Sequence, residues 1–481
     1  MESFGCRASQ ADGDAIASGL EALGATAAAG FPRTDVVIVN TCTVTAEADR
    51  DARAYIRRVQ RSNPQIRIIV TGCYAQRAPE EIAALPGVFA VVGNSHKNQV
   101  ASIALAPPSR SASAAFNLGH SFVPVASLTS ASKASAIRLP GAPAFVLAGD
   151  IFAHSDFQLP SLPASTIDRL VQNPAAGRTR PSLKIQDGCG NRCTFCVIPS
   201  TRGNSRSLPR RAVLDAVEEF VAAGGQELVI SGINLGRWGR DLVPQQRLEY
   251  LLAEIFDTTK LPRLRISSVE PMDWTDGLIS LLRHWGQGSH PRLARHVHIP
   301  LQSASDPVLR RMHRRYRPWH YAERLAKIRV ACPEAAIGAD VMVGFPGETD
   351  AEFQQSYDFI AAQPFTYLHL FPFSARPGTA GWELHRQWPV PAAAIRERMA
   401  ALHALIDRKN LQFRSQFIGK HLSAVTLIAA KEMSDRRRTP AMTDNFLSVE
   451  VAANLESNLL VSVKITGLEH HALSGMITAQ M

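Results

Sequence analysis

The sequence predicts an α/β protein in three parts: an N-terminal parallel α/β domain, a central partial (β/α)6 barrel and a small C-terminal all-β barrel. Along most of the chain, apolar runs alternate with amphipathic stretches, as strands and helices alternate in parallel sheets. The C-terminal end instead contains β-rich runs and glycines. The chain has 481 residues, which is more than one domain with a single hydrophobic core usually contains. Its length alone suggests about three domains.

Residues 1–99 form the predicted N-terminal domain. Two apolar, strand-like segments, 35–40 (DVVIVN) and 65–71 (QIRIIVT), each precede a helix-like segment, 46–61 and 79–85 respectively. This rhythm is typical of a parallel sheet covered by helices.

Three cysteines of this domain directly follow predicted strands: Cys6, Cys42 and Cys73. The carboxyl ends of parallel strands meet at one edge of a sheet, so we expect the three thiols to converge. Burial in the core is the alternative for each, because free cysteine is among the most buried residue types.

Residues 100–176 are rich in Ala, Ser and Pro and lack the regular rhythm. Few large apolar residues are available to offset the entropy of ordering this stretch. We therefore predict an insertion or linker.

Residues 177–414 repeat the strand–helix alternation, which predicts a partial barrel with right-handed crossovers and a site at the carboxyl ends of its strands. The predicted strands are 183–187, 227–231, 263–268, 296–301, 337–343 and 366–372. The predicted helices are 210–223, 247–256, 276–284, 320–330, 350–362 and 392–414.

The most informative motif follows the first of these strands. Cys189, Cys193 and Cys196 have the spacing Cys-x-x-x-Cys-x-x-Cys. Thiolates are the usual ligands of iron–sulfur clusters, and three thiolates on a 4Fe-4S cube leave one iron open to a non-protein ligand. A structural zinc site is the alternative, although it normally has a fourth Cys or His ligand and none is close by.

Other barrel strands end in residues suited to a cofactor. The second strand leads into Ser231 and Gly232 of SGINLG, where glycine lets the backbone approach a ligand closely. The third ends in SSVEP, which offers hydroxyls and the carboxylate of Glu270, and the fourth ends in HIPLQS, which contains Gln302.

Residues 415–481 predict the small β-barrel, with strand-like runs at 421–428, 446–451 and 459–465. The basic triplet Arg436–Arg438 would suit RNA, as loops of five-stranded OB-type barrels do. A solvated loop on a structural cap explains the same residues.

Charge favours a polyanionic partner, because 52 Lys and Arg against 42 Asp and Glu give a net charge of +10. A basic run at 310–317 (RRMHRRYR) indicates either a solvated helix face or phosphate contact. With no N-terminal leader and no apolar stretch of about 18 residues, we expect a cytoplasmic protein without a membrane partner. In that compartment cysteines favour metal binding or burial over disulfides.

Taken together, the motifs resemble those of the radical S-adenosylmethionine (SAM) methylthiotransferases. The chain is most similar to the bacterial tRNA N6-threonylcarbamoyladenosine methylthiotransferases. The resemblance covers the N-terminal domain, the barrel and, more weakly, a C-terminal TRAM-type RNA-binding domain. The matching motifs are QDGCGNRCTFCVIPSTRG at 186–203, ISSVEP at 266–271, HIPLQS at 298–303, VGFPGET at 343–349 and ARPGT at 375–379.

The resemblance implies an enzyme that transfers a methylthio group to carbon 2 of N6-threonylcarbamoyladenosine beside the tRNA anticodon, with SAM as methyl donor and as radical source. It also implies two 4Fe-4S clusters. By position, Cys189, Cys193 and Cys196 match the ligands of the cluster that binds SAM. Cys6, Cys42 and Cys73 match the ligands of an auxiliary cluster. Cys332 matches no ligand, and we expect it in the core.

Strand-end placement makes Ser231, Gly232, Glu270 and Gln302 the expected contacts of SAM. No catalytic residue beyond the cluster ligands is predicted. The implied partners are tRNA and an electron donor such as a flavodoxin or ferredoxin.

Two alternatives remain at this point. The same chemistry could act on tRNA isopentenyladenosine or on an aspartate of a ribosomal protein, since relatives share the barrel and both clusters. The chain could instead be a non-catalytic, metal-containing RNA-binding protein.

Overall fold

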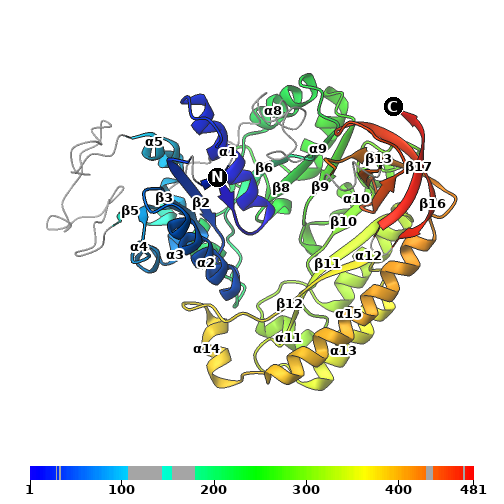
Figure 1. Cartoon of the computed structure of the whole chain (residues 1–481). Coiled ribbons are helices and arrows are strands. Elements are labelled where there is room, and N and C mark those ends of the chain that lie inside the picture. The colour runs from blue at the N-terminus through cyan, green and yellow to red at the C-terminus, as the bar shows by residue number, and fades with distance from the viewer. Residues whose placement is uncertain are drawn as a thin grey trace. The chain divides into compact units, whose positions relative to one another are not determined.

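The computed structural model describes residues 1–28, 30–31, 34–106, 144–153, 179–429, 437–469 and 472–480 (Figure 1). The chain divides into two compact units. The first comprises Met1–Ser161, Asp187–Arg206 and Ser374–Thr379, and the second comprises Leu162–Gln186, Ser207–Phe373 and Ala380–Met481.

The first unit contains a five-stranded parallel sheet in the order β1-β2-β3-β4-β5. Its strands are β1 (Glu2–Ser3), β2 (Val36–Thr41), β3 (Arg67–Gly72), β4 (Val88–Gly93) and β5 (Phe145–Leu147). The edge strand β5 lies within the stretch predicted as an insertion or linker, of which residues 107–143 and 154–176 are outside the described residues.

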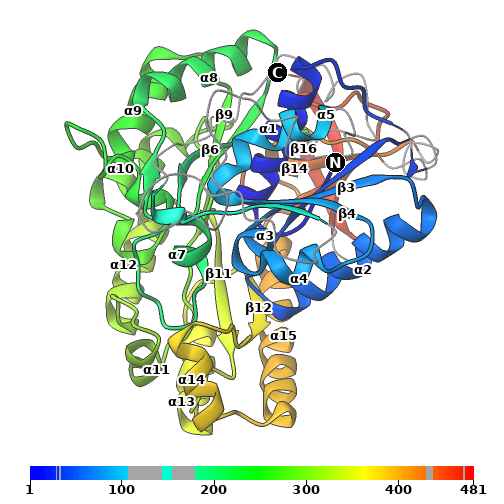
Figure 2. The same ribbon diagram turned by 90° about the vertical axis from the view of Figure 1, so that its left-hand side faces the viewer.

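Helices cover both faces of this sheet (Figure 2). On one face lie α1 (Arg7–Ala22) and α5 (Val100–Leu105), and on the other lie α2 (Ala46–Ser62), α3 (Cys73–Arg77) and α4 (Pro79–Ala83). In α2, the buried residues Ala52, Ile56 and Val59 recur at helical spacing and pack on the strands. The Thr45 side chain begins this helix by accepting a hydrogen bond from Ala48 N.

The second unit holds six strands that run in parallel within two sheets, β7-β6-β8-β9 and β10-β11-β12. These strands are β6 (Ser182–Asp187), β8 (Glu227–Gly232), β9 (Arg263–Ile266), β10 (His296–His298), β11 (Ala336–Val343) and β12 (Tyr367–Pro372), with the short β7 (Arg206–Ser207) at the edge. Hydrogen bonds from Ala294 N to Leu264 O (2.8 Å) and from Val269 N to His298 O (3.1 Å) join the two sheets, so the strands form the predicted partial barrel.

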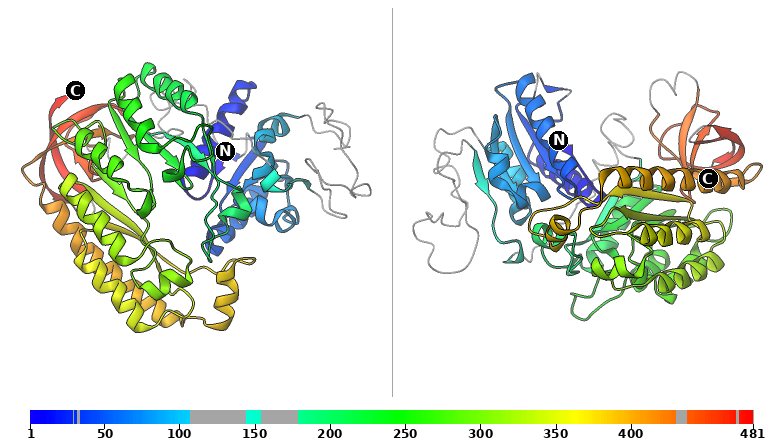
Figure 3. Two further views of the ribbon diagram at one scale, coloured as in Figure 1. Left: turned by 180° about the vertical axis from the view of Figure 1, so that it is seen from behind. Right: turned by 90° about the horizontal axis from the view of Figure 1, so that it is seen from below.

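Helices alternate with these strands along the chain. They are α8 (Arg210–Ala222), α9 (Leu248–Thr258), α10 (Asp276–Trp285), α11 (Asp306–Arg311), α12 (Pro318–Ala331), α13 (Asp350–Ala362), α14 (Ala380–Gln387) and α15 (Ala392–Ser415). The long α15 packs along β12 and leads into the C-terminal barrel (Figure 3).

The C-terminal strands form a closed barrel in the order β13-β14-β15-β17-β16, which is consistent with a TRAM-type domain. The strands are β13 (His421–Thr426), β14 (Thr439–Thr443), β15 (Ser448–Val451), β16 (Leu460–Glu469) and β17 (Ala472–Gln480). Their inward residues make a core of small and branched apolar side chains.

The turn between β14 and β15 contacts the amino ends of the barrel strands. Arg265 donates to the carbonyl oxygens of Thr443 (3.0 Å) and Asp444 (3.2 Å), and Arg295 donates to the Asp444 carboxylate. At the same end, Glu227 is buried among arginines and lies 2.7 Å from Arg265. The C-terminal barrel therefore closes the base of the partial barrel with charged and polar contacts.

None of the described helices combines the length and the apolar character needed to cross a membrane.

Candidate functional site

Three cysteines lie side by side at one edge of the sheet in the first unit. Cys6 follows β1 at the residue before α1, Cys42 follows β2, and Cys73 follows β3 as the first residue of α3. Because β1, β2 and β3 are neighbouring parallel strands, their carboxyl ends present all three residues at the same edge.

Gly5 brings the backbone before Cys6 into contact with the sulfur of Cys42. Gly5 has φ +101°, and a Cβ added there would lie 2.7 Å from Cys42 Sγ. Any side chain at this position would therefore collide with the thiol, in addition to its backbone strain.

The electrostatics of Cys42 reflect this grouping. Burial raises the pKa of its thiol to about 12, with further contributions from Cys73 and Cys6. A metal that binds here must displace these protons, as it does wherever thiolates are ligands.

All seven cysteines lie in the described part of the chain, and none of them forms a disulfide. Three convergent thiols fit a 4Fe-4S cluster that keeps one iron open. The remaining cysteine, Cys332, is buried at the end of α12, as expected for core packing.

Cys189, Cys193 and Cys196 lie on a tight loop after β6. Cys189 N donates to Gly203 O (3.0 Å), which closes the loop. The backbone N–H groups of Asn191 and Ile198 point at the sulfur atoms of Cys189 and Cys196, both at 3.4 Å. Such N–H donors stabilise thiolates, so this loop also fits three-cysteine ligation of a cluster.

Arg202 connects this loop to the N-terminal domain. It ends α7 (Ile198–Arg202) and is 1% exposed. Its guanidinium forms ion pairs with Asp12 and Asp187, both at 2.9 Å, and donates to Ser9 Oγ at 3.3 Å. Arg202 is a functional residue that the cysteine spacing alone does not indicate, although it stands in the VIPSTRG segment directly after the triplet.

Asn94 makes a second connection within the first unit. Its side-chain amide donates to Thr201 O (2.8 Å) and lies 3.6 Å from Cys73 Sγ. Helix α7 also packs against α3, which begins at Cys73. The loop that carries Cys189, Cys193 and Cys196 therefore packs against α3, which carries Cys73.

Ser231 and Gly232, two expected SAM contacts, end β8 in the second unit. The hydroxyl of Ser231 is buried and accepts a hydrogen bond from Ser182 Oγ (2.8 Å). A Cβ on Gly232 would lie 3.0 Å from the side chain of Gln186, which in turn accepts from Asn234 N. The packing of the strands therefore also favours a small hydroxyl residue at position 231 and glycine at position 232.

Gln302 has the features of a ligand contact. It is 8% exposed, has φ +62°, and is held by hydrogen bonds from its own N to Asp340 O (2.7 Å) and from Met342 N to its O (2.9 Å). Its side-chain Oε1 is buried without a hydrogen-bond partner among the described residues. A strained residue with an unsatisfied buried acceptor at a strand end fits a ligand that donates, such as an ammonium group.

Glu270 pairs with the basic run at 310–317. Arg314 is buried and lies 2.5 Å from Glu270 Oε2, and its Nε donates to the hydroxyl of Tyr316. Arg310 and Arg317 pair with Asp306, and Arg311 pairs with Glu352. These four arginines form ion pairs with residues of the same unit. Because Arg314 is also buried, it is not available to contact a phosphate.

In the C-terminal triplet, Arg436 lies outside the described residues. Arg438 forms ion pairs of 2.7 Å with Glu450 and Glu469. Arg437 is exposed and has φ +52°.

Two family profiles match the chain. One is described as Uncharacterized protein family UPF0004 and matches residues 1–93, and the other is described as the Radical SAM superfamily and matches residues 183–360. They cover, in order, the sheet with three cysteines and most of the partial barrel with its cysteine loop.

Among curated proteins, the threonylcarbamoyladenosine tRNA methylthiotransferase MtaB of Bacillus subtilis (strain 168) is 35% identical over 86% of this chain and 81% of that protein. The chain belongs to the radical SAM methylthiotransferase family. The protein of the same name from Aquifex aeolicus (strain VF5) is 30% identical to this methylthiotransferase and aligns over 97% of this chain and 99% of its own. A tRNA-2-methylthio-N(6)-dimethylallyladenosine synthase from Novosphingobium aromaticivorans is 31% identical over 87% of this chain and 84% of its own.

Solved structures support the fold of this methylthiotransferase. The radical S-adenosylmethionine methyltransferase TsrM from Kitasatospora setae superposes with a TM-score of 0.54 at 16% identity, over 78% of this chain and 74% of its own. At this identity the similarity concerns architecture alone.

Family membership makes the protein an enzyme that methylthiolates tRNA by radical SAM chemistry, which rules out the non-catalytic alternative. The cofactors of the family are SAM and two 4Fe-4S clusters. Two sets of three thiols, both in the first unit, fit that requirement.

Proposed function

We infer that this methylthiotransferase acts on carbon 2 of N6-threonylcarbamoyladenosine beside the tRNA anticodon, with SAM as methyl donor and as source of the radical. This choice of substrate is supported by the 35% identity to the Bacillus subtilis protein that is named for threonylcarbamoyladenosine, over most of both chains. Relatives named for dimethylallyladenosine are 28–31% identical.

Each cluster has a proposed set of ligands. Cys189, Cys193 and Cys196 hold the cluster that binds SAM, supported by their spacing and by the N–H donors aimed at their sulfur atoms. Cys6, Cys42 and Cys73 hold the auxiliary cluster, supported by their convergence at one sheet edge. When bound, the first cluster supplies the electron that cleaves SAM and the second supplies the sulfur to be transferred.

The remaining proposed roles belong to side chains at the strand ends. Gln302 accepts a hydrogen bond from SAM through its buried Oε1, and Glu270 contributes a carboxylate whose position Arg314 fixes. Ser231 and Gly232 give the cofactor close access to the backbone at the end of β8. The protein thereby orients the cofactor and excludes water.

The C-terminal barrel is the proposed tRNA-binding module, and a tRNA substrate is consistent with a cytoplasmic location. A flavodoxin or ferredoxin is the proposed source of the electron.

Mass spectrometry of tRNA nucleosides tests the substrate. Cells that lack the protein should lose the methylthio form of threonylcarbamoyladenosine and accumulate the unmethylthiolated nucleoside. Wild-type protein should restore the modification and the Cys189→Ala variant should not. Loss of the methylthio form of isopentenyladenosine instead would contradict the proposed substrate.

A further inference from the structure

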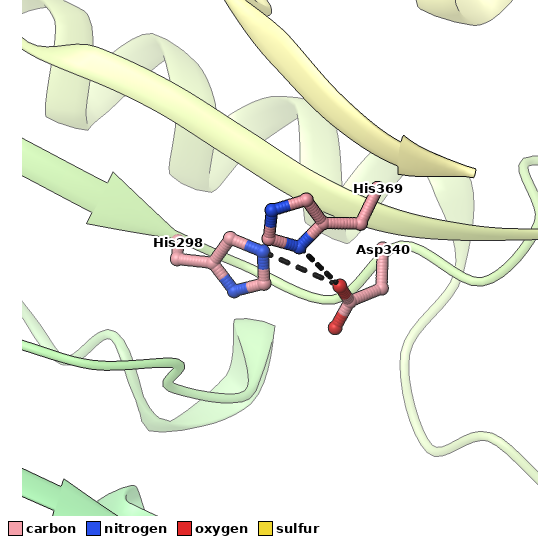
Figure 4. A group of neighbouring side chains, drawn as sticks. All are labelled: His298, Asp340 and His369. Carbon is pink, nitrogen blue, oxygen red and sulfur yellow. Dashed lines mark hydrogen bonds and ion pairs between the residues drawn. The ribbon is translucent and has the colours of Figure 1, made fainter. Parts of the chain in front are cut away.

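Three polar side chains from three neighbouring strands meet in the second unit (Figure 4). His298 ends β10, Asp340 lies in β11 and His369 lies in β12, where Asp340 and His369 are paired in register. His298 Nε2 lies 3.4 Å and His369 Nδ1 lies 3.1 Å from the same oxygen, Asp340 Oδ1. We call this group the His–Asp–His cluster.

The cluster is on the inner face of the strands. In β11, Ile337, Ala339, Val341 and Val343 are at most 2% exposed. Side chains alternate along a strand, so Asp340 faces away from these apolar residues, on the same side as Gly338 and Met342. The apolar residues thus form one face and the cluster the other.

A layer of stacked rings lies next to the cluster on the side of the amino ends. Tyr367 stacks with His296 and with His298, at ring distances of 5.9 and 6.0 Å. Phe446, from the C-terminal barrel, contacts His296 and Tyr367 and is covered by the guanidinium of Arg265. The His–Asp–His cluster therefore lies next to this aromatic layer, on the side of the carboxyl ends of the strands.

Exposure increases across the cluster. The side chain of His298 is 9% exposed, that of Asp340 is 26% exposed and that of His369 is 61% exposed. A ligand can therefore reach His369 and Asp340 without any movement of the strands, whereas His298 is the buried member of the cluster.

The cluster presents several polar atoms that do not face one another. Figure 4 shows the second carboxylate oxygen of Asp340 directed away from both rings. Each imidazole also keeps one ring nitrogen that does not face Asp340. Burial raises the pKa of the Asp340 carboxyl, but the neighbouring His298 and His369 hold it well below its usual range, so this acceptor is ionised.

A group that matches this arrangement carries N–H or O–H groups, because an ionised carboxylate accepts hydrogen bonds, and so does the outward nitrogen of a neutral imidazole that donates to Asp340. A threonylcarbamoyl substituent has both kinds of group, and a dimethylallyl substituent has neither. An apolar substituent placed here would desolvate a carboxylate and two imidazoles without replacing their hydrogen bonds, and sites of this kind discriminate strongly.

We propose that His298, Asp340 and His369 recognise the polar N6 substituent of the target adenosine and select against an apolar one. This inference rests on the proposed function and adds the residues that set its specificity. A divalent metal is the competing ligand, because the three donor atoms lie within 4.8 Å of one another. The 3.1 Å contact between His369 Nδ1 and Asp340 Oδ1 favours recognition, since a ring nitrogen that donates its proton to a carboxylate has no lone pair left for a cation.

Binding of short anticodon stem-loop RNAs tests the proposal. Fluorescence anisotropy on the reconstituted protein without SAM compares RNAs that carry threonylcarbamoyladenosine or isopentenyladenosine at the target position. Wild type should bind the first about tenfold more tightly, the effect of one hydrogen bond to a charged group. His369→Phe and Asp340→Asn should each abolish this preference. The control His403→Phe, at an exposed position on α15, should keep it.

Two results would overturn the proposal. One is an unchanged preference in both His369→Phe and Asp340→Asn, while the nucleoside analysis still shows threonylcarbamoyladenosine as the substrate. The other is one zinc per chain retained after dialysis against zinc chloride and lost in Asp340→Asn. If wild type instead prefers the isopentenyl RNA and the nucleoside analysis agrees, the proposed function itself fails, which separates the two conclusions.

Discussion

Arg202 forms a 2.9 Å ion pair with Asp12, and both side chains are almost completely buried. Asp12 belongs to the helix that follows Cys6, and Arg202 follows Cys196 by one short helix. Lys97 also pairs with Asp12 at 2.6 Å, so this buried network joins at least two cations and two carboxylates. The pair holds both cysteine-bearing segments of the first unit together.

Arg202→Met should destabilise the cofactor-free protein by about 3 kcal/mol, because it leaves buried carboxylates with too few cations. The thermal midpoint of the first unit should fall by roughly 6–12 °C. Arg202→Lys should lose less, since it keeps the charge. Arg211→Met, which removes an exposed arginine paired only on the surface of α8, is the matched control and should change the midpoint little. Equal midpoints for Arg202→Met and Arg211→Met would contradict the role of the network.

Iron analysis tests the assignment of the cysteines. Anaerobically reconstituted wild type should contain about eight irons per chain, the content of two cubes. Replacing Cys189, Cys193 and Cys196 by Ala should leave about four, and so should replacing Cys6, Cys42 and Cys73.

Cys332→Ala is the control for both triple variants, since this thiol is buried at the end of α12 and should not affect the iron content. A triple variant that retains all of its iron would remove that set from the proposed ligands.

Gln302→Leu should have opposite effects on stability and on cofactor binding. It removes a buried oxygen that has no partner among the described residues, so the thermal midpoint of the SAM-free protein should stay the same or rise. The dissociation constant for SAM, measured by equilibrium dialysis, should increase about tenfold because one hydrogen bond to a charged group is lost. An unchanged dissociation constant would exclude Gln302 as a SAM contact.

Glu227 should make the second unit sensitive to acid. Burial raises the pKa of its carboxyl, but Arg265 and Arg180 outweigh this and lower the pKa from 4.5 to about 2. Since the pKa is lower in the folded than in the unfolded state, the stabilisation is fully present above pH 4.5 and is lost as the pH falls towards 2. A shift of this size corresponds to about 3 kcal/mol.

Thermal melts between pH 7 and pH 3 check this prediction. Glu227→Gln should lower the midpoint at pH 7 and flatten its decline with acid, whereas Glu218→Gln, at an exposed position on α8, should behave as wild type. Parallel pH profiles for Glu227→Gln and wild type would contradict it.

The sequence predicted elements well where their signal is local. Helix α13 occupies residues 350–362 as predicted, and β11 begins one residue before its predicted start. Strand β10 was predicted to reach residue 301 but ends at His298. The apolar run continues past that point, but Pro300 cannot donate to the strand ladder and Gln302 turns the backbone to positive φ.

The sequence predicted that Cys6, Cys42 and Cys73 meet at one sheet edge, but it did not indicate which side chains meet elsewhere. The His–Asp–His cluster depends on the register of β10, β11 and β12, and no local pattern in any one strand indicates its neighbours. The ion pairs of Arg202 depend equally on tertiary packing. Strand β5 is only three residues long and lies in an Ala- and Pro-rich stretch, so its signal is too weak to distinguish from a linker.

The contacts of Arg265 and Arg295 with the turn at Asp444 determine whether the C-terminal barrel can be removed or exchanged. A chain truncated before β13 would leave both guanidinium groups, and the ring of Tyr367, facing water. The C-terminal barrel is thus also a structural component of the partial barrel. Exchanging it between relatives would require these contact residues to move with it.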